Sequence, residues 1–177
     1  VYHGPKGLGY IAGKVHASAV TVADAINKFG FYNINTSFFD TITVKADAAK
    51  VKAAAAKREI NFYYIDAQTV SVAFNETTSL KDCNDIIAVF AEAAGKTAET
   101  VTQLATTAAL PESLQRTSAF LTHNVFNSYH SETALMRYIK KLERLDLSLT
   151  HSMIALGSCT MKLNAAAEML PLSMANW

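Results

Sequence analysis

The chain has 177 residues, of which 50% are hydrophobic and only 18% are charged, and its formal net charge is +1. This near-neutral balance does not favour nucleic acid or an anionic membrane as a partner, and no apolar run reaches the ~18 residues that a bilayer-spanning helix needs. Because soluble domains average roughly 25% charged residues, the low charged fraction indicates that a larger polypeptide or an oligomer covers part of the surface.

Cys83 and Cys159 are the only cysteines, and neither has neighbours at a metal-ligand spacing. Two thiols without a secretory segment are typical of a reducing cytoplasm, so we expect a cytoplasmic protein without a disulfide framework. The chain begins without an initiator Met and stops at Trp177 without an acidic tail. We therefore expect it to be a piece of a longer protein.

The first elements alternate between helical and extended patterns. Pro5 suits the first turn of a helix, whose apolar residues recur at helical spacing to position 29 before Gly30 ends it. Residues 38–45 then alternate between apolar and polar side chains, which predicts a strand. The Ala- and Lys-rich segment 46–58 predicts a short helix.

Two further strands are predicted at 60–65 and 69–75. Ser79, with Asp82 three residues later, is the capping pair of a helix that Gly95 ends. The order helix–strand–helix–strand–strand–helix predicts a small α+β unit, a three-stranded sheet with an antiparallel pair and helices on one face.

The second half of the chain has a different character. Residues 96–118 show no sustained periodicity, which favours a linker. Ser131 then caps an amphipathic helix that extends to about position 149, and we expect its apolar side to face inward and its charged side to be solvated. In the first half, Cys83 lies on the apolar stripe of the helix that Ser79 caps, and it is predicted to be a buried core thiol.

Two segments concentrate polar side chains. His123 and His130 are seven residues apart, which is the wrong local geometry for a metal pair, so we expect a polar network and no metal site there. The turn 157–164, Gly-Ser-Cys-Thr-Met-Lys-Leu-Asn, fits either a capped helix start or an anion-binding turn. The chain lacks the dinucleotide, Walker, nucleophile-elbow and zinc-protease motifs.

The stretch 151–164 closely resembles a segment of the P-protein family of the glycine cleavage system, the pyridoxal-phosphate-dependent glycine decarboxylases. Residues 117–123 and 126–133 resemble the segment just before it in the same family, and 3–8 and 61–64 are similar in place and order. The resemblance extends over essentially the whole chain, and its most specific part is the Ser-Cys-Thr-Met-Lys-Leu-Asn core.

This resemblance implies a fold and a division of the chain. The family's enzyme resembles two fold-type-I halves in tandem, with the active site built chiefly by the second. Residues 1–104 then correspond to the small α+β domain that closes the first, non-catalytic half, and 105–118 to a linker. Residues 119–177 correspond to the helical start of the catalytic half, so the chain is expected to be an α+β fragment of an α/β-type enzyme.

The resemblance also implies the chemistry. Pyridoxal phosphate is the expected cofactor, glycine the substrate and the lipoyl arm of the H-protein the acceptor of the aminomethyl group; the remainder of the P-protein or a second subunit would complete a dimeric assembly. The family's cofactor lysine follows a histidine in a glycine-rich region. This chain has no His-Lys pair and only 7 glycines. We therefore expect that lysine to lie outside the chain, the chain to contain no catalytic residue, and the fragment alone to be inactive.

By the same resemblance, polar residues of two segments would line the rim of the cofactor and substrate pocket. These pocket-rim residues are Ser158, Thr160, Lys162 and Asn164, followed by Cys159, His123, Asn127 and His130. Two alternatives remain open from the residues themselves. The chain could be a non-catalytic scaffold whose helices, 5–29 and 131–149, pack against partner chains, or an independent anion-binding domain that uses the turn 157–160.

Overall fold

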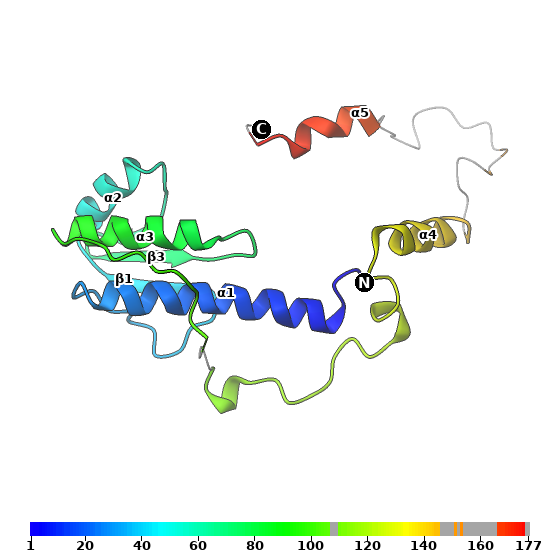
Figure 1. Cartoon of the computed structure of the whole chain (residues 1–177), viewed down its shortest axis with the longest axis horizontal. Helices are drawn as coiled ribbons and strands as arrows, with labels where there is room; N and C mark the ends of the chain where they lie inside the picture. Colours follow the sequence, from blue (N-terminus) through cyan, green and yellow to red (C-terminus); the bar gives the residue numbers. More distant parts are fainter. Residues whose placement is uncertain (107–109, 146–150, 152, 154–165, 176–177) are drawn as a thin grey trace. The chain divides into compact units, whose positions relative to one another are not determined.

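The computed structural model describes residues 1–106, 110–145, 151, 153 and 166–175 (Figure 1). By their internal contacts the residues form two units, Val1–His130 and Ser131–Trp177, and each is described by itself. Among the described residues, no helix is both long enough and apolar enough to cross a membrane.

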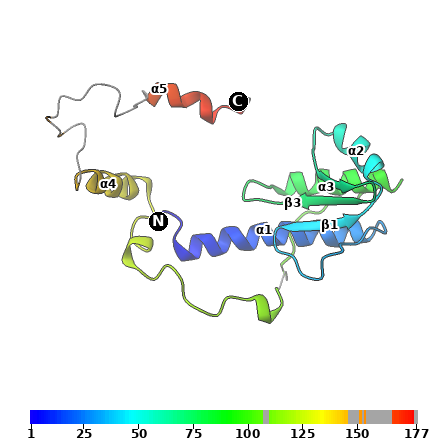
Figure 2. The same ribbon diagram turned by 180° about the vertical axis from the view of Figure 1, so that it is seen from behind.

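The first unit contains a small antiparallel sheet with helices against one face, so the predicted α+β class is confirmed (Figures 1 and 2). The strands lie in the order β1-β3-β2 and are β1 (Thr41–Lys45), β2 (Tyr63–Asp66) and β3 (Thr69–Ala73). The main helices are α1 (Gly4–Asn27), α2 (Ala48–Ala56) and α3 (Leu80–Ala93). Both strand pairings are antiparallel, where the sequence predicted one such pair.

The register of the sheet explains which face is buried. Ile42 pairs with Val72 and Val44 with Val70, so four β-branched side chains lie on one face, and all four are buried. Because side chains alternate along a strand, the opposite face receives the threonines and serine of the same strands. The predicted alternation of apolar and polar side chains along these strands therefore places the apolar ones in the core.

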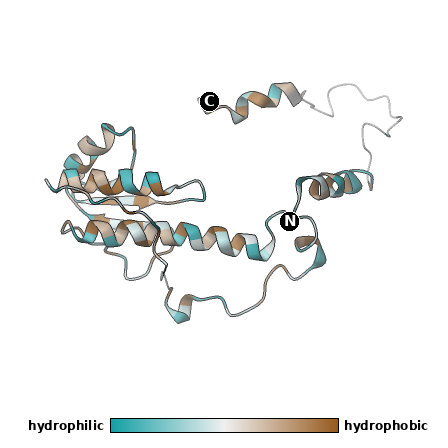
Figure 3. Cartoon of the chain, viewed as in Figure 1, coloured by the Kyte–Doolittle hydropathy of each residue, from teal (hydrophilic) through white to brown (hydrophobic). Residues whose placement is uncertain are grey.

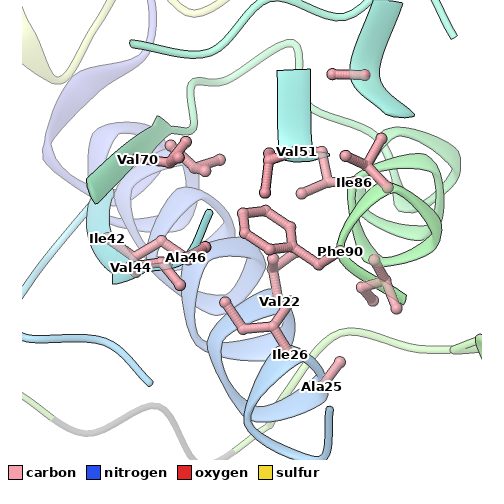
Figure 4. Packing of buried hydrophobic residues seen from close by; sticks show 14 of the residues in the cluster. Val22, Ala25, Ile26, Ile42, Val44, Ala46, Val51, Val70, Ile86 and Phe90 are labelled. Carbon is pink, nitrogen blue, oxygen red and sulfur yellow. The ribbon is translucent and has the colours of Figure 1, made fainter. Parts of the chain in front are cut away.

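Aliphatic side chains surround the ring of Phe90 in the space between the sheet and the helices (Figure 4). Phe90 of α3 has no exposed surface, and its ring lies 5.5 Å from that of Phe31 and 5.9 Å from that of Phe62. Val22 and Ile26 of α1 belong to the same cluster and are fully buried. The non-polar area removed from water by this cluster is the main stabilising contribution to the unit.

The helix boundaries follow local signals. The Ser79 hydroxyl accepts a hydrogen bond from the Asp82 backbone N–H, and the Asp82 carboxylate accepts from Ser79, so the predicted capping pair is confirmed as a complete capping box. Gly30 and Gly95 follow their helices with φ of +96° and +66°, values that glycine adopts without a Cβ penalty. The second helix begins later than predicted because the Asp47 side chain accepts from two backbone N–H groups at its start.

Two features of the unit differ from the sequence expectation. The segment predicted as strand from position 38 becomes regular only at Thr41, and the preceding residues turn back so that Ile34 N–H donates to the Thr43 carbonyl at 2.8 Å along the outer edge of β1. Residues 96–105, expected to lack structure, are fixed to the helices. The Asn84 side chain donates to and accepts from the backbone of Val101, and Thr21 accepts from the Ala105 N–H.

Cys83 lies in the core with no exposed surface, as predicted. Burial raises the pKa of its thiol, with a smaller opposing effect from a hydrogen bond with Ser18. A thiol with a raised pKa has less thiolate at neutral pH and is a weak nucleophile. Cys83 is therefore a packing residue.

The second unit contains the amphipathic helix α4 (Glu132–Glu143), followed by the short α5 (Ala166–Met169) and a 3-10 turn, Leu170–Ser173. The predicted cap is confirmed, since the Ser131 hydroxyl accepts from the Ala134 N–H at 3.3 Å. The expectation that the apolar side of α4 faces inward is not met among the described residues, because the helix has no buried residue. The ribbon of α4 carries both hydrophilic and hydrophobic residues (Figure 3). Besides α4, the described part of this unit contains only α5 and the 3-10 turn.

The predicted division into 1–104, 105–118 and 119–177 stays a prediction. It concerns the halves of a longer enzyme, whereas contacts within this chain divide it between His130 and Ser131.

Candidate functional site

The structure describes three of the predicted pocket-rim residues, His123, Asn127 and His130. The others lie outside the described residues: Ser158, Cys159, Thr160, Lys162 and Asn164. The described part of the site therefore consists of His123, Asn127, His130 and the residues that surround them.

His123 and Asn127 shape a tight loop. The loop contains a short 3-10 helix, Asn124–Phe126, and the His123 Nδ1 caps it by accepting from the Val125 N–H at 3.1 Å. The Asn127 side-chain amide then donates to the carbonyls of Leu121, at 2.9 Å, and His123, at 3.1 Å. These bonds within one segment are the polar network that the sequence predicted.

His130 joins this loop to the beginning of α1. Its Nδ1 lies 2.7 Å from the carbonyl oxygen of Tyr2, a residue 128 positions earlier in the chain. Gly4 makes the approach possible, because a Cβ at that position would lie 2.7 Å from both the His130 Cε1 and the Phe126 carbonyl oxygen. Gly4 also has a φ of +61°, a backbone conformation that favours glycine.

The contact leaves an open cavity of about 500 Å³ beside the first turn of α1. Its lining comes from both segments and comprises Tyr2, His3, Gly4, Pro5, Lys6, Asn127 and His130. A second cavity, of about 490 Å³, lies between the end of α1 and residues 96–103 and is lined by none of the predicted pocket-rim residues. We take the first cavity as the candidate site because it contains two of them.

The hydrogen bonds determine which polar atoms this site offers to a ligand. A carbonyl can only accept, so the His130 Nδ1 must carry the hydrogen, and Nε2 is the ring atom that can accept from a ligand in this tautomer. Asn127 donates both hydrogens of its amide to the loop, which leaves its carbonyl oxygen for a ligand. Lys6 adds an exposed ammonium group. Such a set can bind and orient a polar molecule.

Among the described residues there is no cluster of three or more His, Cys, Asp or Glu side chains that could bind a metal ion. The three described pocket-rim residues also differ in role. Asn127 and His130 line the cavity. His123 instead stabilises the loop, because its ring caps the 3-10 helix and its carbonyl accepts from the Asn127 amide.

Sequence reasoning missed the residues of Tyr2–Lys6 as part of this site. No local sequence pattern predicts a contact between the two ends of a 130-residue unit. The available signal was the glycine before Pro5: Gly4 is the first residue of α1, and a residue without a Cβ at a helix start is consistent with a close approach by another segment.

Comparison with known proteins identifies the relatives of this chain. Residues 1–90 match the model of the family described as "Glycine cleavage system P-protein". Among curated proteins, a "Glycine dehydrogenase (decarboxylating)" of Flavobacterium johnsoniae is 71% identical over 177 residues, and the protein of the same name in Christiangramia forsetii is 60% identical. The corresponding protein of Bacteroides fragilis is 44% identical over 181 aligned residues.

Each of these alignments covers 100% of this chain and 19% of the relative. The chain therefore spans about one fifth of the length of the curated relatives that it matches, while similarity to them extends over its whole length.

Proposed function

Because the chain belongs to the glycine cleavage system P-protein family, we propose that it acts as a segment of a glycine decarboxylase. The observation that supports this most strongly is the 71% identity, over the entire chain, to a protein named glycine dehydrogenase (decarboxylating). At that level of identity the segment is expected to have the same place in the intact enzyme as in the relative.

The proposed reaction uses glycine and a protein carrier. The bond between the glycine α-carbon and its carboxylate breaks, and carbon dioxide leaves. A new carbon–sulfur bond then joins the aminomethyl group to one sulfur of the lipoyl disulfide of the H-protein as the sulfur–sulfur bond breaks. The second sulfur takes up a proton and becomes a thiol, so the disulfide is reduced by two electrons and the glycine carbon is oxidised. Pyridoxal phosphate, when bound, supplies the electron-accepting ring that this decarboxylation requires.

The described residues fit the edge of such a site better than its centre. Lys6 is the lysine that lines the candidate cavity, and it is exposed at the beginning of α1. A lysine that binds a cofactor covalently must be desolvated or paired to be a nucleophile at neutral pH. Lys6 therefore does not fit that role. Because the chain also has no His-Lys pair, we place the cofactor lysine outside it and assign no catalytic residue within it.

In this proposal the pocket-rim residues bind and orient the substrate. Asn127 and His130 offer acceptor atoms at the cavity, and the Lys6 ammonium can attract the glycine carboxylate. The resemblance of the turn around Ser158 and Thr160 to the family supports a second group of rim residues there, with Cys159, Lys162 and Asn164 beside them.

The exposed helix α4 supports the proposal that a larger assembly completes this chain. Its apolar side chains include Ile139, 49% exposed, and Leu142, 46% exposed. In a protein five times longer, the remainder of the polypeptide or a second subunit of a dimer can cover that side. We propose the cytoplasm as its location, since the two cysteines do not suggest an oxidising compartment.

The experiment that tests the function uses the intact protein that contains this chain. Carbon dioxide release from carboxyl-labelled glycine is measured with pyridoxal phosphate, in the presence and absence of the lipoylated H-protein. We expect glycine-dependent release that rises strongly with the H-protein, and none from the 177-residue chain alone. Absence of release by the intact protein would overturn the function, and release by the chain alone would overturn its assignment as an incomplete segment.

A further inference from the structure

Helix α4 has a strongly basic side. Arg137, Lys140, Lys141 and the C-cap residue Arg144 recur at spacings of three and four, which places them along one side of a helix. The apolar residues Leu135, Ile139 and Leu142 lie along the other side at the same spacing. The helix is thus divided into an apolar side and a cationic side.

Among the residues that the structure describes, most of this positive charge has no acidic partner. Lys140 forms an ion pair with Glu143 at 2.7 Å. Arg137, Lys141 and Arg144 are exposed and form no ion pair in the part of the chain that the structure describes. The chain as a whole has 16 basic and 15 acidic residues, so this is a local concentration of charge.

The basic side chains also surround a hollow. It measures about 440 Å³ and is lined by Arg137, Lys140, Lys141, Arg144 and Leu145. Leu145 is among the most exposed large apolar side chains of the chain, at 77%. Guanidinium groups bind carboxylates in a bidentate manner, and an apolar side chain among them adds contact area. The surface therefore fits a folded partner with carboxylates on its own surface.

We propose that the basic side of α4 is the docking surface for an acidic patch on the carrier protein that presents the lipoyl arm, an inference that rests on the proposed function. The proposed reaction needs a protein substrate that binds and leaves at every turnover. Charge complementarity suits that task because it raises the association rate and orients the partner without making the complex too stable to dissociate.

A membrane surface is the other class of partner that a basic amphipathic helix can bind. The observations favour the protein. The apolar side of the described helix has Leu135 and Leu142 but no Trp or Phe, so it carries only part of the usual lipid-anchoring set, and the proposed reaction supplies a protein carrier but no lipid.

The test uses the intact enzyme with the double substitution Arg137→Glu and Arg144→Glu. Initial rates are measured against the concentration of the lipoylated carrier at about 20 mM and about 200 mM salt. We expect the KM for the carrier to rise about tenfold at the lower salt and the difference to shrink at the higher salt. The rate with lipoamide, a neutral acceptor without a protein surface, should stay unchanged.

Two further variants control for charge and folding. Lys50→Glu with Lys52→Glu changes the net charge by the same amount on exposed positions of α2, and it should leave the KM for the carrier unchanged. Arg137→Lys with Arg144→Lys retains the charge but loses the bidentate geometry, so the KM for the carrier should rise by about threefold, less than in the Arg→Glu variant.

Several results would overturn the proposal. These are an unchanged KM for the carrier in the Arg→Glu variant, an equal change in the α2 control, or a parallel loss of the lipoamide rate, which would indicate damage to the active site. Co-sedimentation of the parent enzyme, but not of the Arg→Glu variant, with phosphatidylserine vesicles would assign the surface to lipid instead. Failure of the proposed function is distinguishable, because the parent enzyme would then release no carbon dioxide with either acceptor.

Discussion

Helices α3 and α4 begin in the same way and differ in what covers them. Ser79 and Ser131 each accept a hydrogen bond from the backbone N–H three residues later, and both helices are amphipathic. Six residues of α3 are buried, and α3 packs against α1 and α2 in the cluster that also contains the buried face of the sheet, whereas α4 has no buried residue. Local sequence determines where a helix begins and which side is apolar, and only the surrounding chain determines whether that side is covered.

The largest expected difference between the two regions concerns their apolar side chains. Phe90→Ala should lower the free energy of unfolding of the 177-residue chain by about 3–5 kcal/mol, because it leaves a cavity beside Phe31 and Phe62. Leu142→Ala removes a half-exposed side chain and should change the free energy of unfolding by less than about 0.5 kcal/mol. Denaturant titration of both variants measures the contrast, and equal losses would mean that α4 belongs to the cooperative core.

A smaller effect is expected where the loop that contains His130 meets α1. Gly4→Ala places a Cβ against Phe126 and His130 at a positive φ, and should cost about 2 kcal/mol or open this contact. The matched control is Gly13→Ala in the same helix, which meets no atom within 4 Å and should stabilise the helix by up to about 1 kcal/mol. Hydrogen exchange at residues 123–130 should accelerate in the first variant alone. Unchanged exchange there would show that the junction tolerates a side chain.

The smallest effect concerns the two caps. Ser79→Ala should lower the free energy of unfolding by about 1 kcal/mol, whereas Ser131→Ala should reduce the helicity of α4 and leave the core transition in place. A shifted core transition in Ser131→Ala would contradict the account.

The cap of α3 should also depend on pH. Hydrogen bonds from the Ser79 side chain and backbone lower the pKa of Asp82. A carboxyl with a lowered folded-state pKa stabilises the fold above its unfolded value, and that contribution is lost as pH falls through the folded value. The effect of Ser79→Ala should therefore be largest near about pH 7 and shrink at acidic pH, as thermal unfolding at several pH values can show.

The sequence predicted the elements of the first unit well because each has a local signal. The capping pair at Ser79, the glycines at 30 and 95 and the alternation of Ile42 and Val44 act over a few residues, and the core thiol Cys83 follows from the helical stripe. These signals do not depend on the distant parts of the chain.

The candidate site could be predicted only in part. The sequence predicted a polar network at His123, Asn127 and His130. It did not predict the contact of His130 with Tyr2, because no sequence periodicity relates residues 128 positions apart. Likewise, the pattern of α4 predicts an apolar side but does not show what lies against it. The role of the turn around Ser158 stays a prediction, since that turn lies outside the described residues.

Hydrogen exchange, compared between the 177-residue chain and the intact enzyme, tests most directly whether this chain is a segment completed by a larger assembly. The account predicts that backbone amides of α4 (Glu132–Glu143) exchange at least about tenfold more slowly in the intact enzyme, while those of α3 (Leu80–Ala93), already packed, change little. Equal exchange of α4 in both proteins would contradict the account, because the apolar side of that helix would then remain uncovered in the complete enzyme.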